Sequence, residues 1–131
     1  MTFEKLVKKA ENVLGSRKIA DNAWVGSVSA AVLSETGKVY TGVCIDVSCG
    51  MGFCAEHAAI AAMITAGESK IIKAVAISKD GVLAPCGRCR EFMSQIHQDN
   101  IHAEIMVASD KVVKLSELLP FRWDVSENVY N

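Results

Sequence analysis

The chain has 131 residues, half of them hydrophobic, and a formal net charge of -1 at pH 7. This length fits one packed domain, and we expect residues 1–131 to form it. No apolar run reaches the roughly 18 residues that span a membrane, and no basic block offers the positive surface by which nucleic acid is held.

The cysteines indicate the compartment in which the chain works. They are Cys44, Cys49, Cys54, Cys86 and Cys89. The first nine residues include three lysines, but no apolar segment follows them, so we expect no signal peptide. An odd number of cysteines with one C-x-x-C pair is typical of metal or thiol chemistry in a reducing compartment. We therefore expect a cytoplasmic protein that is not attached to a membrane.

The N-terminal half is expected to form a helix and a β-hairpin. Its predicted elements are a helix over 2–14, a loop over 16–24, strands over 25–33 and 38–45, and a loop over 46–53. The helix shows apolar residues at helical spacing, and Gly15 can end it. Gly37 lies just before the second strand, which favours a short hairpin turn.

The C-terminal half alternates helices and strands. Its predicted elements are a helix over 54–66, a strand over 71–78, a helix over about 86–98, strands over 101–108 and 111–114, and a helical turn over 115–119. Alanines make the helix over 54–66 slim, which suits burial inside a domain. This alternation predicts an α/β fold in which helices cover a mixed sheet.

Two short stretches carry recognisable chemistry: C-A-E-H at 54–57 and P-C-G-R-C-R at 85–90. Cys86 and Cys89, three residues apart in the first turn of a helix, present both sulfurs on one side. Cys54 opens the other helix. Thiols at helix N-termini have a lowered pKa, which favours the thiolate. Three thiolates can bind one zinc ion (Zn2+) and leave the fourth position to water, as in catalytic zinc sites.

Glu56 is the predicted catalytic residue, because it lies near the metal position without being a ligand. Zinc lowers the pKa of its bound water. We expect the Glu56 carboxylate to take the proton and to pass it to a ring nitrogen and then to a leaving amine. Such acid–base catalysis contributes about 10²–10⁴-fold in rate. A non-ligating Glu with a Pro-Cys-x-x-Cys second half is the signature of zinc deaminases, so the pattern predicts a hydrolytic deaminase.

Other interpretations of these residues remain open. Cys49 can complete a structural zinc site with four thiolates, which gives a non-catalytic zinc module and leaves Glu56 unexplained. The cysteines can also be buried apolar residues without a metal. Cys44 is expected in the core of a strand and Cys49 in a loop near the pocket. His57 is either a buried satisfied histidine, a hydrogen-bond donor to a cysteine sulfur, or a packed residue.

These motifs resemble the cytidine deaminase superfamily over roughly residues 25–120. The resemblance is strongest at Thr41–Val43, Cys54–Ile60, Ala84–Glu91 and Glu117–Pro120. A cysteine as the first ligand is similar to the compact homotetrameric branch of cytidine deaminases and blasticidin S deaminases, and the run at 85–90 resembles the latter most. The resemblance implies a three-layer α/β fold with a five-stranded mixed sheet flanked by helices. It also implies a homotetramer in which neighbouring subunits complete each pocket.

Several positions depart from the pattern of that family. Its Asn-x-Glu triplet, which grips the ribose, corresponds here to Cys44, Ile45 and Asp46, so Cys44 and Asp46 are the implied substrate contacts. Gly26 and Ser27 lie near the place of a phenylalanine that packs on the pyrimidine. The family commonly has an arginine after the catalytic glutamate, and this chain has His57 at that position.

The resemblance also assigns two residues outside the metal motifs. Arg90 is expected to help ease the negative charge of the three thiolates. An aromatic residue after the Leu-Leu-Pro turn closes a pocket in the family; Trp123 is the match here and Phe121 the second choice.

The sequence thus predicts a zinc deaminase of a small molecule that contains cytosine. Cytidine or deoxycytidine, converted to the uracil form with release of ammonia, is the first expectation. The alternative substrate is a cytosine nucleoside analogue, such as blasticidin S or an N4-modified cytidine. A nucleic-acid-editing deaminase is disfavoured, because it needs basic and aromatic surface to hold a strand and aromatic residues make up only 6% of this chain.

Overall fold

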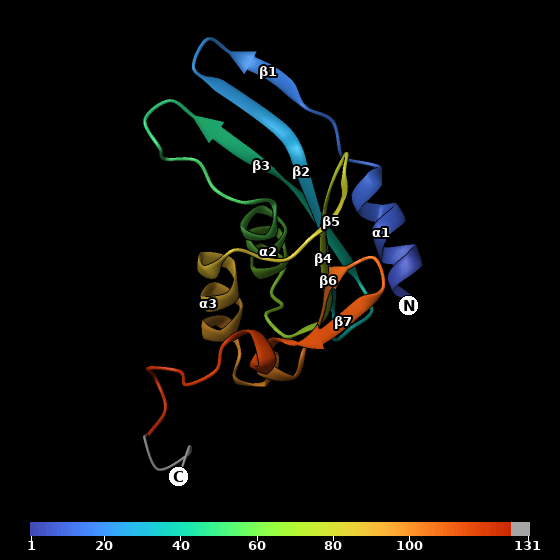
Figure 1. The fold of residues 1–131 in the computed structure, drawn as a ribbon, viewed down its shortest axis with the longest axis vertical. Helices are drawn as coiled ribbons and strands as arrows, with labels where there is room; N and C mark the ends of the chain where they lie inside the picture. The colour runs from blue at the N-terminus through green and yellow to red at the C-terminus, as the bar shows by residue number, and fades with distance from the viewer. Residues whose placement is uncertain (127–131) are drawn as a thin grey trace.

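The computed structural model describes residues 1–126, which form a sheet with helices on both faces (Figure 1). Residues 127–131 lie outside the described residues. The helices are α1 (Phe3–Glu11), α2 (Ala55–Thr65) and α3 (Gly87–Ile96), with 3-10 turns at Gln98–His102 and Leu115–Leu118. The strands are β1 (Arg17–Ala20), β2 (Ala23–Ser34), β3 (Val39–Val47), β4 (Ile71–Ser78), β5 (Gly81–Leu83), β6 (Glu104–Ala108) and β7 (Lys111–Lys114).

The sheet has seven strands, so the expected number of five is wrong. Five strands do form a continuous row in the order β3-β2-β4-β6-β7, in which only β4 and β6 run parallel, so the sheet is mixed as predicted. The two additional strands are short hairpin partners: β1 pairs with the start of β2, and β5 pairs with the end of β4. The loop predicted over 16–24 is therefore partly a strand.

The sheet packs against helices on both faces because successive residues of a strand point to opposite sides. On one face, Ala31 and Leu33 of β2 pack with Leu6 and Ala10 of α1. On the other face, alternate residues of β2 and β4 form the larger core with α2 and α3. Its fully or nearly buried members include Ala30, Val32, Ala59, Ile60, Met63, Ala74, Cys89 and Met93. The three predicted layers are thus present.

Helix α2 lies very close to β3 because of Gly42. A Cβ atom built at Gly42 would lie only 2.4 Å from the backbone nitrogen of Ala59, so no larger residue fits there. The opposite face of α2 is exposed at Ala61, Ala62 and Ile64. The expectation that this helix is buried is therefore wrong for its outer face, since nothing in the described part of the chain covers it.

The chain after α3 differs from the prediction because a buried asparagine holds it in a 3-10 turn. The Asn100 side chain accepts a hydrogen bond from the Ile71 backbone N–H at 2.7 Å and donates to the Met93 carbonyl at 2.9 Å. His97 has an extended backbone and ends α3. Strand β6 consequently begins at Glu104 rather than at residue 101.

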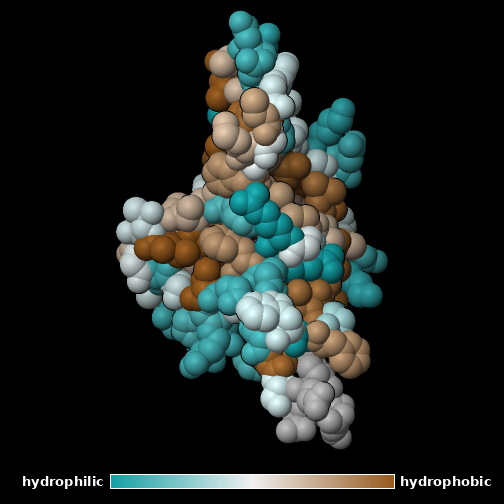
Figure 2. Space-filling model, turned by 90° about the vertical axis from the view of Figure 1, so that its left-hand side faces the viewer, coloured by the Kyte–Doolittle hydropathy of each residue, from teal (hydrophilic) through white to brown (hydrophobic). Residues whose placement is uncertain are grey.

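The surface carries apolar patches between hydrophilic regions, as the brown and teal areas of Figure 2 show for one face. None of the helices within residues 1–126 has the length and apolar character needed to cross a membrane.

Candidate active site

Three cysteine sulfurs meet where α2 and α3 begin. Cys54 is the N-cap of α2 and Cys86 the N-cap of α3. The Cys86 sulfur lies 3.5 Å from the Cys54 sulfur and 3.5 Å from the Cys89 sulfur. All three sulfurs lie within 4.8 Å of one another, and this is the group within residues 1–126 that could hold a metal ion. The structure therefore brings together the three cysteines predicted from the sequence.

The sulfur positions fit a zinc ion. Tetrahedral zinc with Zn–S distances near 2.3 Å separates its sulfur ligands by about 3.8 Å, close to the observed 3.5 Å. Soft thiolate ligands also select zinc over harder cations. Cys49 does not belong to the group and instead lines a separate hollow beside residues 20–23. The alternative of a site with four thiolates is thus unsupported by this geometry.

The three thiols differ in acidity. Burial opposes ionisation of Cys86, but hydrogen bonds from the Cys89 backbone and from the thiols of Cys54 and Cys89 outweigh it and lower the pKa of Cys86. Burial, followed by the hydrogen bond with Cys86, raises the pKa of Cys54. Burial and then the nearby Glu56 charge raise the pKa of Cys89 strongly. Desolvation is thus the largest influence on all three thiols, and hydrogen bonds at the start of α3 overcome it at Cys86.

Glu56 lies in the first turn of α2 and lines the same cavity as Cys54 and Cys86. Its side chain is 95% buried, since only 5% is exposed. Burial raises the pKa of Glu56, and hydrogen bonds from its own backbone and from the Cys89 thiol offset this only partly. A raised pKa lies closer to the pH at which an enzyme works, which favours a general acid–base role for this carboxyl group.

His57 supports the sulfur cluster from within the core. Its Nδ1 lies 3.3 Å from the Cys89 sulfur, and its ring stacks on Phe92 at 4.2 Å between centroids. Burial, followed by the charge of Arg88, lowers the pKa of His57. The interpretations left open for His57 therefore coexist, since its ring is buried, packs on Phe92 and contacts the Cys89 sulfur.

The arginines of the second motif have different surroundings from those expected. Arg90 donates to the Pro85 carbonyl at 2.7 Å and to the Leu118 carbonyl at 3.5 Å, so it fixes the backbone rather than the sulfurs. Arg88, which the sequence analysis did not single out, lines the cavity instead. Its position between Cys86 and Cys89 is the signal that could have identified it.

The cavity over the sulfurs has a volume of about 390 Å³. Its wall away from the metal position comes from β2 and β3 and includes the predicted contacts Cys44 and Asp46, together with Ser27. These residues form a polar row. The Ser27 hydroxyl lies 3.2 Å from the Cys44 sulfur, and the Cys44 thiol donates to Asp46 Oδ2 at 3.7 Å.

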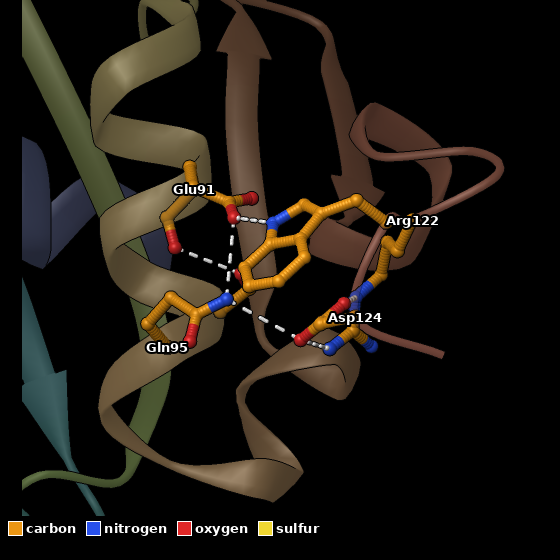
Figure 3. Close-up of polar contacts among 6 residues, drawn as sticks. Glu91, Gln95, Arg122 and Asp124 are labelled. Atoms are coloured by element: carbon orange, nitrogen blue, oxygen red, sulfur yellow. Dashed lines mark hydrogen bonds and ion pairs between the residues drawn. The ribbon is translucent and has the colours of Figure 1, made fainter. Parts of the chain in front are cut away.

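Trp123 is not among the residues that line this cavity but lies beside Glu91 of α3. Figure 3 shows Glu91 and Gln95 of α3 together with Arg122 and Asp124 of the segment that carries Trp123. The Trp123 indole N–H donates to the Glu91 carboxylate. Gln95 donates to Asp124 at 3.3 Å, and Asp124 pairs with Arg122 at 2.8 Å. Trp123 and Phe121 are each 77% exposed. A role for either residue in a pocket therefore depends on a neighbouring subunit and stays a prediction.

Known proteins of similar sequence support the deaminase class that the three cysteines and Glu56 predict. No family model matches the chain. A cytidine deaminase from Sporosarcina psychrophila is 33% identical over 102 residues, which cover 72% of this chain and 70% of that protein. A cytidine deaminase from Mycobacterium tuberculosis is 38% identical over 69 residues, but the match spans only 52% of its length and 51% of this chain. The chain belongs to the cytidine deaminase family.

Solved structures show the same fold over nearly the whole chain. The crystal structure of cytidine deaminase from Mycobacterium tuberculosis matches with a TM-score of 0.79 and 23% identity, and covers 95% of this chain and 99% of its own. That of cytidine deaminase from Burkholderia pseudomallei matches with a TM-score of 0.75 and 24% identity, and covers 94% and 100%. The α/β class predicted from the sequence is confirmed.

Proposed function

We propose that the chain is a zinc-dependent hydrolytic deaminase that converts cytidine, deoxycytidine or a related cytosine nucleoside to the uracil compound and releases ammonia. The observation that carries this proposal is the position of the buried Glu56 in one cavity with the sulfur cluster. A structural zinc site does not require a buried carboxyl group with a raised pKa beside its sulfurs, whereas such groups are typical of catalytic sites. The relatives described as cytidine deaminases support the reaction class.

Cys54, Cys86 and Cys89 would hold the zinc ion, whose chemistry is to lower the pKa of water and so supply a nucleophile near neutral pH. The chain's own contribution is proton transfer. The Glu56 carboxylate takes a proton from the attacking water and delivers it to the ring nitrogen N3, beside the carbon that carries the amino group. It then takes the second proton from the hydroxyl group newly bound to that carbon and gives it to the amine, which leaves as ammonia as the C–N bond breaks and the C=O bond forms. The net change adds one water and releases one ammonia.

The wall opposite the sulfurs is proposed to bind the sugar. Cytosine must place its amino-bearing carbon near the sulfurs, so a sugar on the other side of the ring faces Cys44 and Asp46. The Asp46 carboxylate offers acceptors to sugar hydroxyls, whereas the Cys44 thiol is already hydrogen-bonded and is a weak donor. We therefore expect only moderate activity on cytidine, and higher activity on a cytosine compound with a different sugar or amino substituent.

Assembly and location complete the proposal. We propose a cytoplasmic homotetramer of single deaminase domains with shared pockets. Two features support assembly: the exposed outer face of α2, where Ile64 is 43% exposed, and the exposed Phe121 and Trp123 after the 3-10 turn at Leu115–Leu118. A deaminase that is fully active as a monomer in sedimentation experiments would contradict the shared pockets.

The test is to incubate zinc-loaded protein with cytidine, deoxycytidine, blasticidin S and N4-methylcytidine and to follow ammonia release. Glu56→Gln is the control variant, because it keeps the shape of the site but cannot move a proton. X-ray absorption should show three sulfur neighbours and one lighter atom at the zinc. Four sulfur neighbours, with no ammonia from any compound, would support the non-catalytic zinc module instead.

A further inference from the structure

We infer that His57 is a positioning residue of the metal site: its Nδ1–H group donates a hydrogen bond to the Cys89 sulfur when that sulfur is a zinc-bound thiolate, and this bond strengthens zinc binding. The inference rests on one part of the proposed function, the binding of zinc by the three cysteines. It gives a role to a residue that takes no part in the proton transfer by Glu56.

The three sulfurs differ in their access to hydrogen-bond donors. Cys86 is exposed and Cys54 is partly exposed, so water can reach both residues, whereas Cys89 is fully buried. The Cys89 backbone N–H is directed to the Cys86 sulfur, at 3.5 Å. A buried charged acceptor that lacks a donor destabilises the site. The Cys89 thiolate therefore depends on a donor from the protein interior.

The His57 ring supplies this donor. Its Nδ1 lies 3.3 Å from the Cys89 sulfur. A ring nitrogen of histidine can donate or accept, depending on where the proton lies. A zinc-bound thiolate carries no proton and can only accept, so the proton of this pair belongs to Nδ1 whenever zinc is bound. This assignment is the same for a neutral and for a charged imidazole.

The two partners of this bond occupy equivalent places in their helices. His57 is the third residue of α2 and follows its N-cap, Cys54, whereas Cys89 is the third residue of α3 and follows Cys86. An α-helix turns by about 100° per residue. His57 is therefore directed to α3, while the preceding Glu56 lines the cavity.

Two aromatic rings hold the imidazole in this orientation. Phe92 lies three residues after Cys89 on the same side of α3, and its ring stacks on His57 at 4.2 Å between centroids and 12° between planes. Phe53 contacts the imidazole edge-on, at 6.4 Å and 77°. Because this packing restricts the ring on both sides, the donor is in place before zinc binds.

The experiment measures the zinc affinity of the purified protein and its variants by competition with a chromophoric chelator. His57→Leu removes the donor, and the affinity should fall by about 10–100-fold, the usual loss when a residue that supports a metal ligand is removed. His57→Asn, whose amide can place an N–H near the position of Nδ1, should stay within about threefold of the native protein. His102→Leu, at an exposed histidine, is the matched control and should bind zinc as the native protein does.

The absorption spectrum of the cobalt-substituted protein separates the hydrogen bond from packing. A hydrogen bond stabilises the electrons of a thiolate, so its loss should move the sulfur-to-cobalt charge-transfer band to longer wavelength. We expect this shift in His57→Leu and not in His57→Asn. Phe92→Leu, which keeps the donor but removes its stacking partner, should lose affinity severalfold and show a smaller shift.

Three outcomes would overturn the inference and leave the proposed function intact. The first is a zinc affinity of His57→Leu within about twofold of the native value. The second is an equal loss in His57→Leu and His57→Asn with no difference between their spectra, which would indicate packing alone. The third, decisive if His57→Leu does not fold, is native affinity and absorption in Phe92→Leu. A native protein that binds no zinc would overturn both.

Discussion

The two ends of the active-site cavity are built in different ways. At the sulfur end, residues at the starts of two helices face one another, and Glu56 and Cys89 are buried. At the opposite end, which we propose to face the sugar and call the sugar end, Ser27 and Asp46 lie on strands and are exposed to solvent. Buried groups are fixed by packing on every side, whereas exposed groups can be replaced at little cost to stability. We therefore expect the sulfur end to determine the reaction and the sugar end to determine the substrate.

The largest effect is expected at a buried ligand. Cys89→Ser should abolish zinc binding and activity on every substrate, because Cys89 is fully buried between the other sulfurs and His57. Metal analysis of the purified variant measures the loss. Cys49→Ser is the control, since Cys49 is exposed and lines another hollow, and it should keep one zinc per chain. Equal zinc loss in both variants would contradict the assigned ligand set.

Glu56→Gln should leave zinc bound but lower kcat by about 10²–10⁴-fold for all cytosine compounds alike, the usual contribution of general acid–base catalysis. The uniform loss follows because Glu56 acts at the ring and not at the sugar. Steady-state kinetics with at least two substrates tests this. A variant whose loss depends strongly on the sugar would show that the two ends of the cavity are not separate in function.

At the sugar end a smaller and selective effect is expected. Asp46→Ala should lower kcat/KM for cytidine by about ten- to a hundredfold, mainly through KM, since loss of a charged hydrogen bond costs about 1.5–3 kcal/mol. Glu35→Ala removes an exposed carboxylate in the turn between β2 and β3 and serves as the control. If cytidine proves the best substrate by a wide margin and Asp46→Ala equals the native protein, the proposed sugar contact is wrong.

The smallest effect concerns a network far from both ends. Glu68 accepts hydrogen bonds from Tyr40 at 2.6 Å, Thr36 at 2.7 Å and Ser34 at 2.9 Å. The hydrogen bonds from Tyr40 and then Thr36 lower the pKa of Glu68. A lowered folded-state pKa gives stability that is present above the unfolded value of about 4.3 and is lost as the pH falls through the folded value.

Glu68→Gln should therefore unfold more easily than the native protein at pH 7, and the difference should shrink below about pH 4. Urea unfolding at several pH values measures it, and the kinetics at pH 7 should stay native because the network contacts neither end of the cavity. An identical midpoint of unfolding at pH 7 would show that the network does not stabilise the fold.

The sulfur end could be predicted from the sequence because its geometry is local. Cys54 starts one helix, and Cys86 and Cys89 lie three residues apart in the first turn of another. Helix geometry alone therefore sets the direction of each side chain. The sugar end was harder to predict. Strand β1 has an exposed residue at every position, so Arg17–Ala20 lacks the alternation that identifies a strand. Strand β2 pairs with β1 up to Val25 and with β4 from Val28, a change of partner that depends on long-range pairing and that no short motif records.

The acidity of the thiols shows a second limit of sequence reasoning. Helix N-termini predict thiolates at all three cysteines, yet only the pKa of Cys86 is lowered. The extent of burial at Cys89 depends on the packing of α2 against α3 and the sheet. This tertiary packing is not encoded in the C-x-x-C spacing.

The close packing at Gly42 has a consequence for how this protein can change over evolutionary time. Because α2 contacts β3 at backbone distance, the helix that begins at Cys54 and the strand that carries Asp46 are held as one rigid unit. The distance between the sulfur cluster and Asp46 therefore stays the same as the sequence changes. New substrates are more readily acquired by single substitutions of exposed strand residues than by insertions that move the helix. Each intermediate along such a path would keep the proposed deamination chemistry.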